Sequence, residues 1–158
     1  MHDISNYRKI KENAENFYKK ISRLNCPAFN NETVYFNSEG FHHLIYKKKS
    51  ERSKNDQITK FKLLPIAKEI ISISTTFQEY DEGLVEISRK RFKKKVKETV
   101  AVRYWGLVAI IRNKKVKVIV RQIGHGQKHF FSVIPAWTIS HYKNTKIVST
   151  VKGDLASD

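Results

Sequence analysis

The sequence predicts an α+β fold, in which N-terminal helices pack on a four-stranded antiparallel β-meander. Apolar residues recur at helical spacing in the first half of the chain, whereas runs of β-branched and aromatic residues separated by turn residues fill the second half. Charge is a third observation, because 31 Lys and Arg against 15 Asp and Glu give a formal net charge of +16 on 158 residues. Such an excess favours a polyanionic partner, with nucleic acid as the leading candidate.

Three segments have the pattern of amphipathic helices. Residues 3–24 repeat apolar side chains at three- and four-residue spacing, and we expect this helix to end before Pro27. Ser38 can cap a second helix that runs through Tyr46 or beyond. A third helix is expected from about Ile58 to Ile73, with a kink or a late start at Pro65.

Four segments have the composition of consecutive strands. LVEI begins at Leu84 and runs into the basic stretch RKRFKKKVK, and it is followed by TVAVRYWGLVAII, VKVIVRQI and HFFSVI. We expect two-residue turns at Asn113-Lys114 and His125-Gly126. A short extended piece is also expected at 34–36.

These turns set a register in which Leu107 lies opposite Val120, and Val120 opposite Phe131, on a dry face of the sheet. Gly106 then lies opposite Arg121, and the other face carries a basic hollow formed by Tyr104, Ile119, Arg121, Lys128, Phe130 and Ser132. His129 has two readings. It lies on the dry face in this register, but a bulge at the glycine corner would turn it toward Arg121.

We divide the chain into an N-terminal helical extension (1–33), a main domain (34–142) and a C-terminal tail (143–158). The single cysteine, Cys26, excludes an intramolecular disulfide and fits a reducing compartment. No run approaches the roughly 20 apolar residues of a membrane span, and the N-terminus lacks an apolar signal core. We therefore expect a cytoplasmic protein without a membrane partner.

His43 is the first candidate for chemistry. Lys47 follows it at the four-residue spacing that places both on one side of a helix, and this side can face either a cleft or water. His42 lies beside Tyr46 and is expected to be a packing residue.

Arg121, Lys128, His129 and Ser132 form the second candidate group. RNA cleavage without metal needs a base for the 2′-hydroxyl, cations facing the pentavalent phosphate and a proton for the leaving 5′-oxygen. Histidine and arginine suit these tasks. The alternative is a basic sheet edge whose charges prevent aggregation.

The third candidate is the run from Arg89 to Lys97, which holds seven Lys or Arg in nine residues. It can form a β-arm that follows a phosphate backbone, or a solvated face without a partner. The expected nucleic-acid contacts are Lys47, Arg89, Arg91, Lys93, Lys94, Lys95, Lys97, Arg103 and Lys128. Tyr104, Trp105, Phe130 and Trp137 can stack on bases, although aromatic residues in strands are usually buried in the core.

Sequence motifs for other chemistries are missing. The chain has no phosphate-binding glycine loop, no HExxH motif and no carboxylate cluster of the two-metal nuclease type. GHGQKH spaces two histidines four apart but lacks acidic or cysteine ligands nearby, which leaves zinc as a minor reading. We expect neither a cofactor nor a metal.

The order VYFNSEGFHHLI, a helix around KLLPIAKEII, and strands closing with GQKHFFSVIP resembles the phage-associated branch of the barnase, EndoU, colicin and RelE-like ribonuclease superfamily. The resemblance covers 34–135 and rests on a glycine-hydrophobe-x-histidine element and an aromatic-serine-valine strand ending. It implies His43 rather than His42, singles out Ser132, and places Arg121 and His129 on the last strands. It also implies an RNA-cleaving toxin held in check by an antitoxin or immunity partner. The doubled histidine, the basic arm and the long first helix depart from the family pattern.

The sequence thus predicts a metal-independent endoribonuclease. We expect His43 to act as base or acid, His129 as the second proton carrier, Arg121 and Lys128 as phosphate ligands, and Ser132 as a hydrogen-bonding group. The RNA class, whether tRNA, mRNA or rRNA, stays open, and an acidic antitoxin is the expected protein partner. The alternatives are a non-catalytic DNA- or RNA-binding protein and an adaptor whose arm docks an acidic protein.

Overall fold

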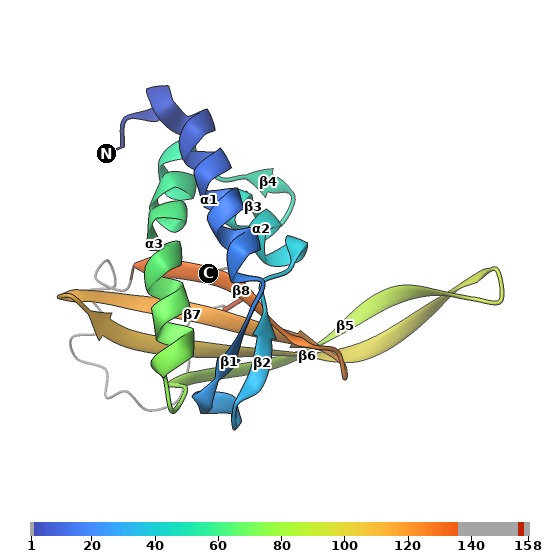
Figure 1. Cartoon of the computed structure of the whole chain (residues 1–158). Coiled ribbons are helices and arrows are strands. Elements are labelled where there is room, and N and C mark those ends of the chain that lie inside the picture. The colour runs from blue at the N-terminus through green and yellow to red at the C-terminus, as the bar shows by residue number, and fades with distance from the viewer. Residues whose placement is uncertain (1, 136–154, 157–158) are drawn as a thin grey trace.

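A computed structural model of the chain describes residues 2–135 and 155–156, which form an α+β fold (Figure 1). The predicted class is confirmed, but the sheet has six strands rather than four. The first half contains η1 (Ile4–Asn6), α1 (Tyr7–Ile21), β1 (Arg23–Cys26), η2 (Pro27–Phe29), β2 (Glu32–Tyr35), α2 (Ser38–Ile45), the small hairpin of β3 (Tyr46–Lys47) and β4 (Ser50–Glu51), and α3 (Lys54–Ile73). The second half contains β5 (Glu79–Arg91), β6 (Lys94–Ile111), β7 (Lys114–Ile123) and β8 (Lys128–Pro135).

The main sheet has the strand order β1-β2-β8-β7-β6-β5. Strands β5 to β8 pair antiparallel in sequence order, as the consecutive-strand pattern predicts. Strand β2 adds to β8 in parallel through only two residue pairs, and β1 pairs antiparallel with β2. These two additions account for the difference from the predicted four strands.

Helix α3 ends at Ile73 as predicted, but the other helix boundaries differ from those predicted. Helix α1 stops at Ile21, since Ser22 adopts a φ of 57° and the chain reverses into β1. Helix α2 is capped by Asn37, whose side chain accepts a hydrogen bond from the Gly40 N–H, and it stops one residue before Tyr46. Helix α3 starts four residues before Ile58 under a Ser53 cap, so the late start at Pro65 is wrong.

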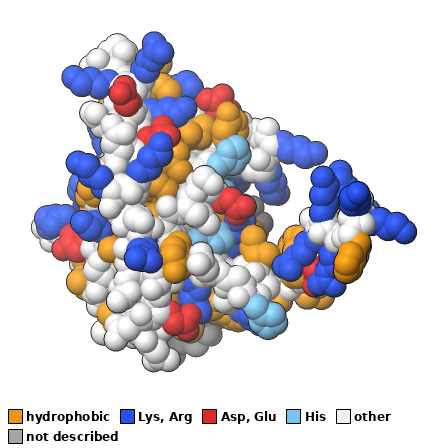
Figure 2. Space-filling view, turned by 45° about the vertical axis from the view of Figure 1, so that its right-hand side comes forward, with side chains coloured by type: hydrophobic (Ala, Val, Ile, Leu, Met, Phe, Trp, Pro, Cys, Tyr) orange, Lys and Arg blue, Asp and Glu red, His pale blue; other side chains and the backbone are white. Residues whose placement is uncertain are grey.

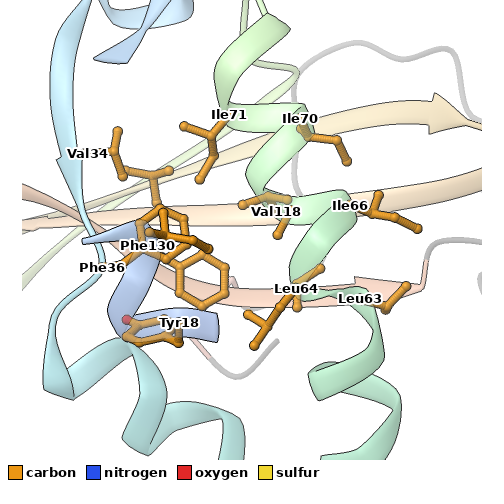
Figure 3. Close-up of a cluster of buried hydrophobic side chains, with 14 of the residues drawn as sticks. Tyr18, Val34, Phe36, Leu63, Leu64, Ile66, Ile70, Ile71, Val118 and Phe130 are labelled. Carbon is orange, nitrogen blue, oxygen red and sulfur yellow. The ribbon is translucent and has the colours of Figure 1, made fainter. Parts of the chain in front are cut away.

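Helix α3 lies across one face of the sheet, and α1 packs against α3 and, through Tyr18 near its own C-terminal end, reaches β8 (Figure 1). Figure 3 shows α3 contributing a stripe of aliphatic side chains that meets the aromatic rings of Tyr18 on α1, Phe36 just after β2, and Phe130 on β8. Tyr18 of α1 lies at the centre of these rings, and its hydroxyl donates to the Asn37 carbonyl at 2.5 Å. The predicted N-terminal extension (1–33) and the described part of the predicted main domain (34–135) therefore share one hydrophobic core.

The turn between β6 and β7 is Arg112-Asn113, one residue earlier than predicted. Leu107 consequently pairs with Val118 and Arg121 with Tyr104, instead of with Val120 and Gly106. Moving a two-residue turn by one position shifts the pairing by two, and a shift of two keeps every side chain on its predicted face.

Strand β8 departs from the prediction within its length. Ile119 pairs with Ser132 as predicted, but a bulge between Ile119 and Val120 then changes the register, so that His129 lies opposite Arg121. The second reading of His129 is thus confirmed, although the bulge lies within the strand pair and the glycine corner is a four-residue loop, 124–127. The same bulge moves Phe130 into the core.

Lys128 also leaves the predicted basic hollow. Its ammonium group contacts Glu32 at 2.7 Å and lies 5.1 Å from the ring centroid of Trp105, a residue of the core.

Within the described residues, no helix combines the length and apolar character needed to cross a membrane.

Candidate functional site

Gly40 allows α2 to lie directly on β8. A Cβ atom at this position would lie 2.3 Å from the Phe130 carbonyl oxygen and 2.4 Å from the Tyr18 hydroxyl, so no larger residue fits. One helical turn later, His43 stacks on Phe131 with ring centroids 3.9 Å apart and is only 8% exposed. His43 therefore points into the protein, and of its two sequence readings the water-facing one is wrong.

Arg52 holds the His43 imidazole from the segment between β4 and α3. Its Nη2 lies 3.1 Å from Nε2 of His43, and its Nε donates to the His43 carbonyl at 3.0 Å. A guanidinium group has donors only, so Nε2 is the acceptor and the imidazole proton is on Nδ1. Burial, followed by the charges of Arg52, Lys60 and Arg121, lowers the pKa of His43 to about 3. The side chain is thus neutral at pH 7.

Arg121 contacts three groups from its position on β7. Its Nε donates to Nε2 of His129 at 2.9 Å, its Nη2 to the Glu39 carboxylate at 2.7 Å, and its guanidinium carbon lies 4.4 Å from the ring centroid of Phe131. We call Glu39, His43, Arg52, Arg121, His129 and Phe131 the site cluster. These contacts form one continuous chain of groups from Arg52 to His129.

His129 is the second neutral imidazole of the site cluster. It is buried, and its Nε2 accepts from Arg121, which again places the ring proton on Nδ1. Burial and then the charge of Arg121 lower the pKa of His129 to about 4, while the Gln127 carbonyl and the Glu39 carboxylate act in the opposite direction. The two histidines therefore differ in their neighbours, since His43 has only cations around it and His129 also has acceptors.

Ser132 lies beside the site cluster and is paired with Lys60. The serine is buried, and its Oγ accepts a hydrogen bond from Lys60 Nζ at 3.1 Å, while the same ammonium group donates to the Val133 carbonyl at 3.0 Å. Lys60 is absent from the residues predicted from the sequence. A signal was present, because Lys60 falls four residues before Leu64 and seven before Ala67, on the apolar stripe of α3.

Arg52 is also absent from the predicted residues, since it lies in the polar stretch 47–57 without any periodic pattern. The backbone N–H of Arg52 donates to the Ile45 carbonyl at 2.7 Å, and its side chain contacts Asp56 at 3.3 Å. The fold of this loop thus delivers the guanidinium, and no local signal indicates it.

Other predicted residues lie away from the site cluster. His42 is exposed and stacks on Tyr46 with ring centroids 4.5 Å apart, which agrees with its packing role. Lys47 lies beyond the end of α2 and is exposed on β3, so the prediction that it shares one side of a helix with His43 is wrong. Arg103 precedes Tyr104, the residue paired with Arg121, so strand alternation places it on the opposite face, where it lies 3.9 Å from Glu82.

Residues 84–101 form a two-stranded ribbon that projects beyond the sheet, because β7 pairs with β6 only from Val102 onward (Figure 1). We call this ribbon the basic arm. All seven Lys and Arg of 89–97 are exposed on it, and Glu98 and Glu86 contact Arg89 and Lys97. Figure 2 shows the Lys and Arg side chains crowded on the arm, and histidines on the face of the main sheet and helices beside it.

Three findings come from the rest of the described chain. No group of three or more His, Cys, Asp or Glu side chains there is arranged to hold a metal ion. Leu155 is buried against Ile119 and Phe131 on the site-cluster side of the sheet. Trp105 and Phe130 belong to the core rather than to a stacking surface, and Trp137 lies outside the described residues.

Comparison of this chain with protein-family models, with curated proteins and with solved structures gives no match.

Proposed function

We propose that the chain is an endoribonuclease that cleaves RNA by attack of the 2′-hydroxyl group and uses side-chain cations instead of a metal. The site cluster carries this proposal. It combines two neutral imidazoles with two guanidinium groups, and one of each, His43 and Arg121, contacts the Phe131 ring. These are the base, acid and phosphate-stabilising groups that the reaction needs.

In the proposed reaction the 2′-hydroxyl loses its proton to a base as the 2′-oxygen bonds to phosphorus. The bond from phosphorus to the 5′-oxygen breaks, and an acid gives that oxygen a proton, which leaves a 2′,3′-cyclic phosphate. We assign His43 as the base, because its imidazole is neutral. Its Nε2 lone pair would take the proton after the Arg52 Nη2 donor turns from Nε2 to the arriving phosphate. We assign His129 as the acid, because the Gln127 carbonyl, and the phosphate that replaces Glu39, would favour its protonated form.

Arg121 is the proposed ligand of the scissile phosphate. Its present partner, Glu39, has a side chain that is 61% exposed, and an ion pair of this kind is weak enough for a phosphate to replace the carboxylate. The arriving negative charge would raise the pKa of both histidines toward the physiological range. The Lys60–Ser132 pair would supply a further cation and a hydroxyl donor beside the phosphate.

The basic arm supports an RNA substrate, because its exposed cations suit a phosphate backbone. We further propose a barnase/RelE-like arrangement for β5 to β8, action as a toxin in the cytoplasm, and an acidic antitoxin or immunity protein that covers the cations.

The arm also favours a second candidate, a non-catalytic RNA- or DNA-binding protein, because phosphate contacts alone require no acid or base.

The test is incubation of the purified protein with total RNA in EDTA, followed by analysis of the product ends. We expect 2′,3′-cyclic phosphate ends and no cleavage of DNA, which lacks the attacking hydroxyl group. Cleavage that requires added magnesium would contradict the mechanism. Binding without cleavage of any RNA would favour the second candidate.

A further inference from the structure

The tip of the basic arm places an aromatic side chain in an unfavourable position. Phe92 and Lys93 connect the paired residues Arg91 and Lys94, with φ angles of 51° and 64°. Positive φ at both central residues is the geometry of a type I′ turn, which favours Asn or Gly and strains a bulky residue. Phe92 is 97% exposed, so no packing within the described chain compensates for this strain.

The surroundings of Phe92 indicate what it contacts. Seven of the nine residues from Arg89 to Lys97 are cations, and all seven are exposed. An exposed aromatic ring among cations is the combination that binds single-stranded nucleic acid, because the ring stacks on a base while the cations contact phosphates.

The arm is continuous with the site cluster. Along β6 and its partners, residues that alternate from Lys94 to Tyr104 share one twisted face, and Tyr104 pairs with Arg121. Arg91 lies opposite Lys94 on that face. Ten residues of strand separate Lys94 from Tyr104, which corresponds to about 30 Å. On this face the arm carries Arg89, Arg91 and Lys94, so a single extended ligand that follows it runs from the tip toward Tyr104, at the border of the site cluster.

We propose that the arm tip is a second RNA-binding site, at which Phe92 stacks on an unpaired base about 30 Å from the cleavage site. This inference rests on the proposed function and narrows its substrate to RNA with an unpaired loop or strand beside the scissile segment. The base must be unpaired, because both faces of a paired base are covered by its neighbours in the duplex. An anionic membrane would also suit aromatic and basic groups, but the shared face with Arg121 favours RNA.

Binding of a labelled 2′-O-methyl RNA hairpin with an unpaired loop tests the proposal by fluorescence anisotropy. This probe has no free 2′-hydroxyl group, so binding is measured whether or not the protein cleaves RNA. We expect Phe92→Ala to weaken binding about tenfold and Phe92→Trp to retain it. Ile110→Ala is the matched control, since Ile110 is 70% exposed at the far end of β6, and it should bind like the wild type.

Phe92→Asn separates binding from a role in the turn. Asn is favoured at this position, so the variant should unfold at the same temperature as the wild type or higher, yet bind the hairpin as weakly as Phe92→Ala. Wild-type binding by both variants would overturn the proposal. So would a loss of binding to phosphatidylserine vesicles without a loss of hairpin binding. If Phe92→Ala loses hairpin binding but the wild type cleaves no RNA, the tip site stands and the nuclease proposal fails.

Discussion

Adjacent histidines on α2 have different environments because successive helical residues point about 100° apart. His43 stacks on Phe131 and accepts a hydrogen bond from Arg52, whereas His42 is exposed and rests on Tyr46. Gly40 controls this difference, because it lets the helix approach β8 closely enough for the rings of His43 and Phe131 to stack. At the scale of the residue, the absence of a side chain at Gly40 therefore allows His43, rather than His42, to join the site cluster.

Substitution of each histidine tests this assignment. We expect His43→Ala to lower the cleavage rate by roughly two or more orders of magnitude, the range for losing a general acid-base group, and Arg121→Ala to do the same. RNA binding should fall far less for His43→Ala than for Arg121→Ala, because a neutral imidazole adds little attraction for phosphate. His42→Ala is the control, with its main effect on thermal stability. An active His43→Ala alongside a folded but inactive His42→Ala would show that the wrong histidine has been chosen.

Two elements shape the surface that RNA would meet. The bulge in β8 reverses the alternation of side chains, which turns His129 toward Arg121 and Lys128 toward the core rings. In the basic arm, β5 and β6 pair with each other and β7 does not extend alongside them. The cations of the arm therefore lie on a two-stranded ribbon that is exposed on both faces. The bulge therefore assembles the site cluster, and the arm extends the charged surface away from it.

Salt dependence tests the contribution of the arm. Replacing Lys93, Lys94, Lys95 and Lys97 by alanine should weaken RNA binding. It should also reduce the slope of log K against log salt by about 0.7 to 0.9 for each phosphate group that the variant no longer neutralises. The fold should survive, because all four side chains are exposed.

A variant that removes four exposed cations from α1, namely Arg8, Lys9, Lys19 and Lys20, is the matched control, because it lowers the net charge equally. An arm variant with the slope of the wild type would show that the arm takes no part in binding.

The two neutral histidines link the stability of the whole molecule to pH. Their pKa values in the folded protein, about 3 for His43 and about 4 for His129, lie below the unfolded value of about 6.5. The unfolded chain therefore binds more protons as the pH falls. The stabilisation is complete above about pH 6.5 and is lost as the pH drops through the interval toward 4.

Urea unfolding at pH 7.5 and at pH 5 measures this effect. We expect the free energy of unfolding to be lower at pH 5, by up to about 1.4 kcal/mol per pH unit for each histidine. In His43→Gln the loss should be smaller, whereas in His42→Ala it should match the wild type. Equal pH dependence in all three proteins would mean that His43 does not stay neutral in the folded state. Carboxylates with a lowered pKa, such as Glu51, contribute mainly below about pH 4.5. His2, whose pKa is also lowered, is present in all three proteins, so the comparison between them isolates His43.

The sequence alone determined the types of most elements, the order of the last four strands and the basic arm, because periodicity, turn residues and charge are local properties of the chain. It also placed Arg121 and Ser132 on one face, since a two-residue shift of register preserves alternation. Only the tertiary structure decided that β2 adds to β8, that a bulge brings His129 to Arg121, and that Arg52 and Lys60 join His43 and Ser132. These features depend on contacts between residues far apart in the chain, whose energies no local pattern encodes.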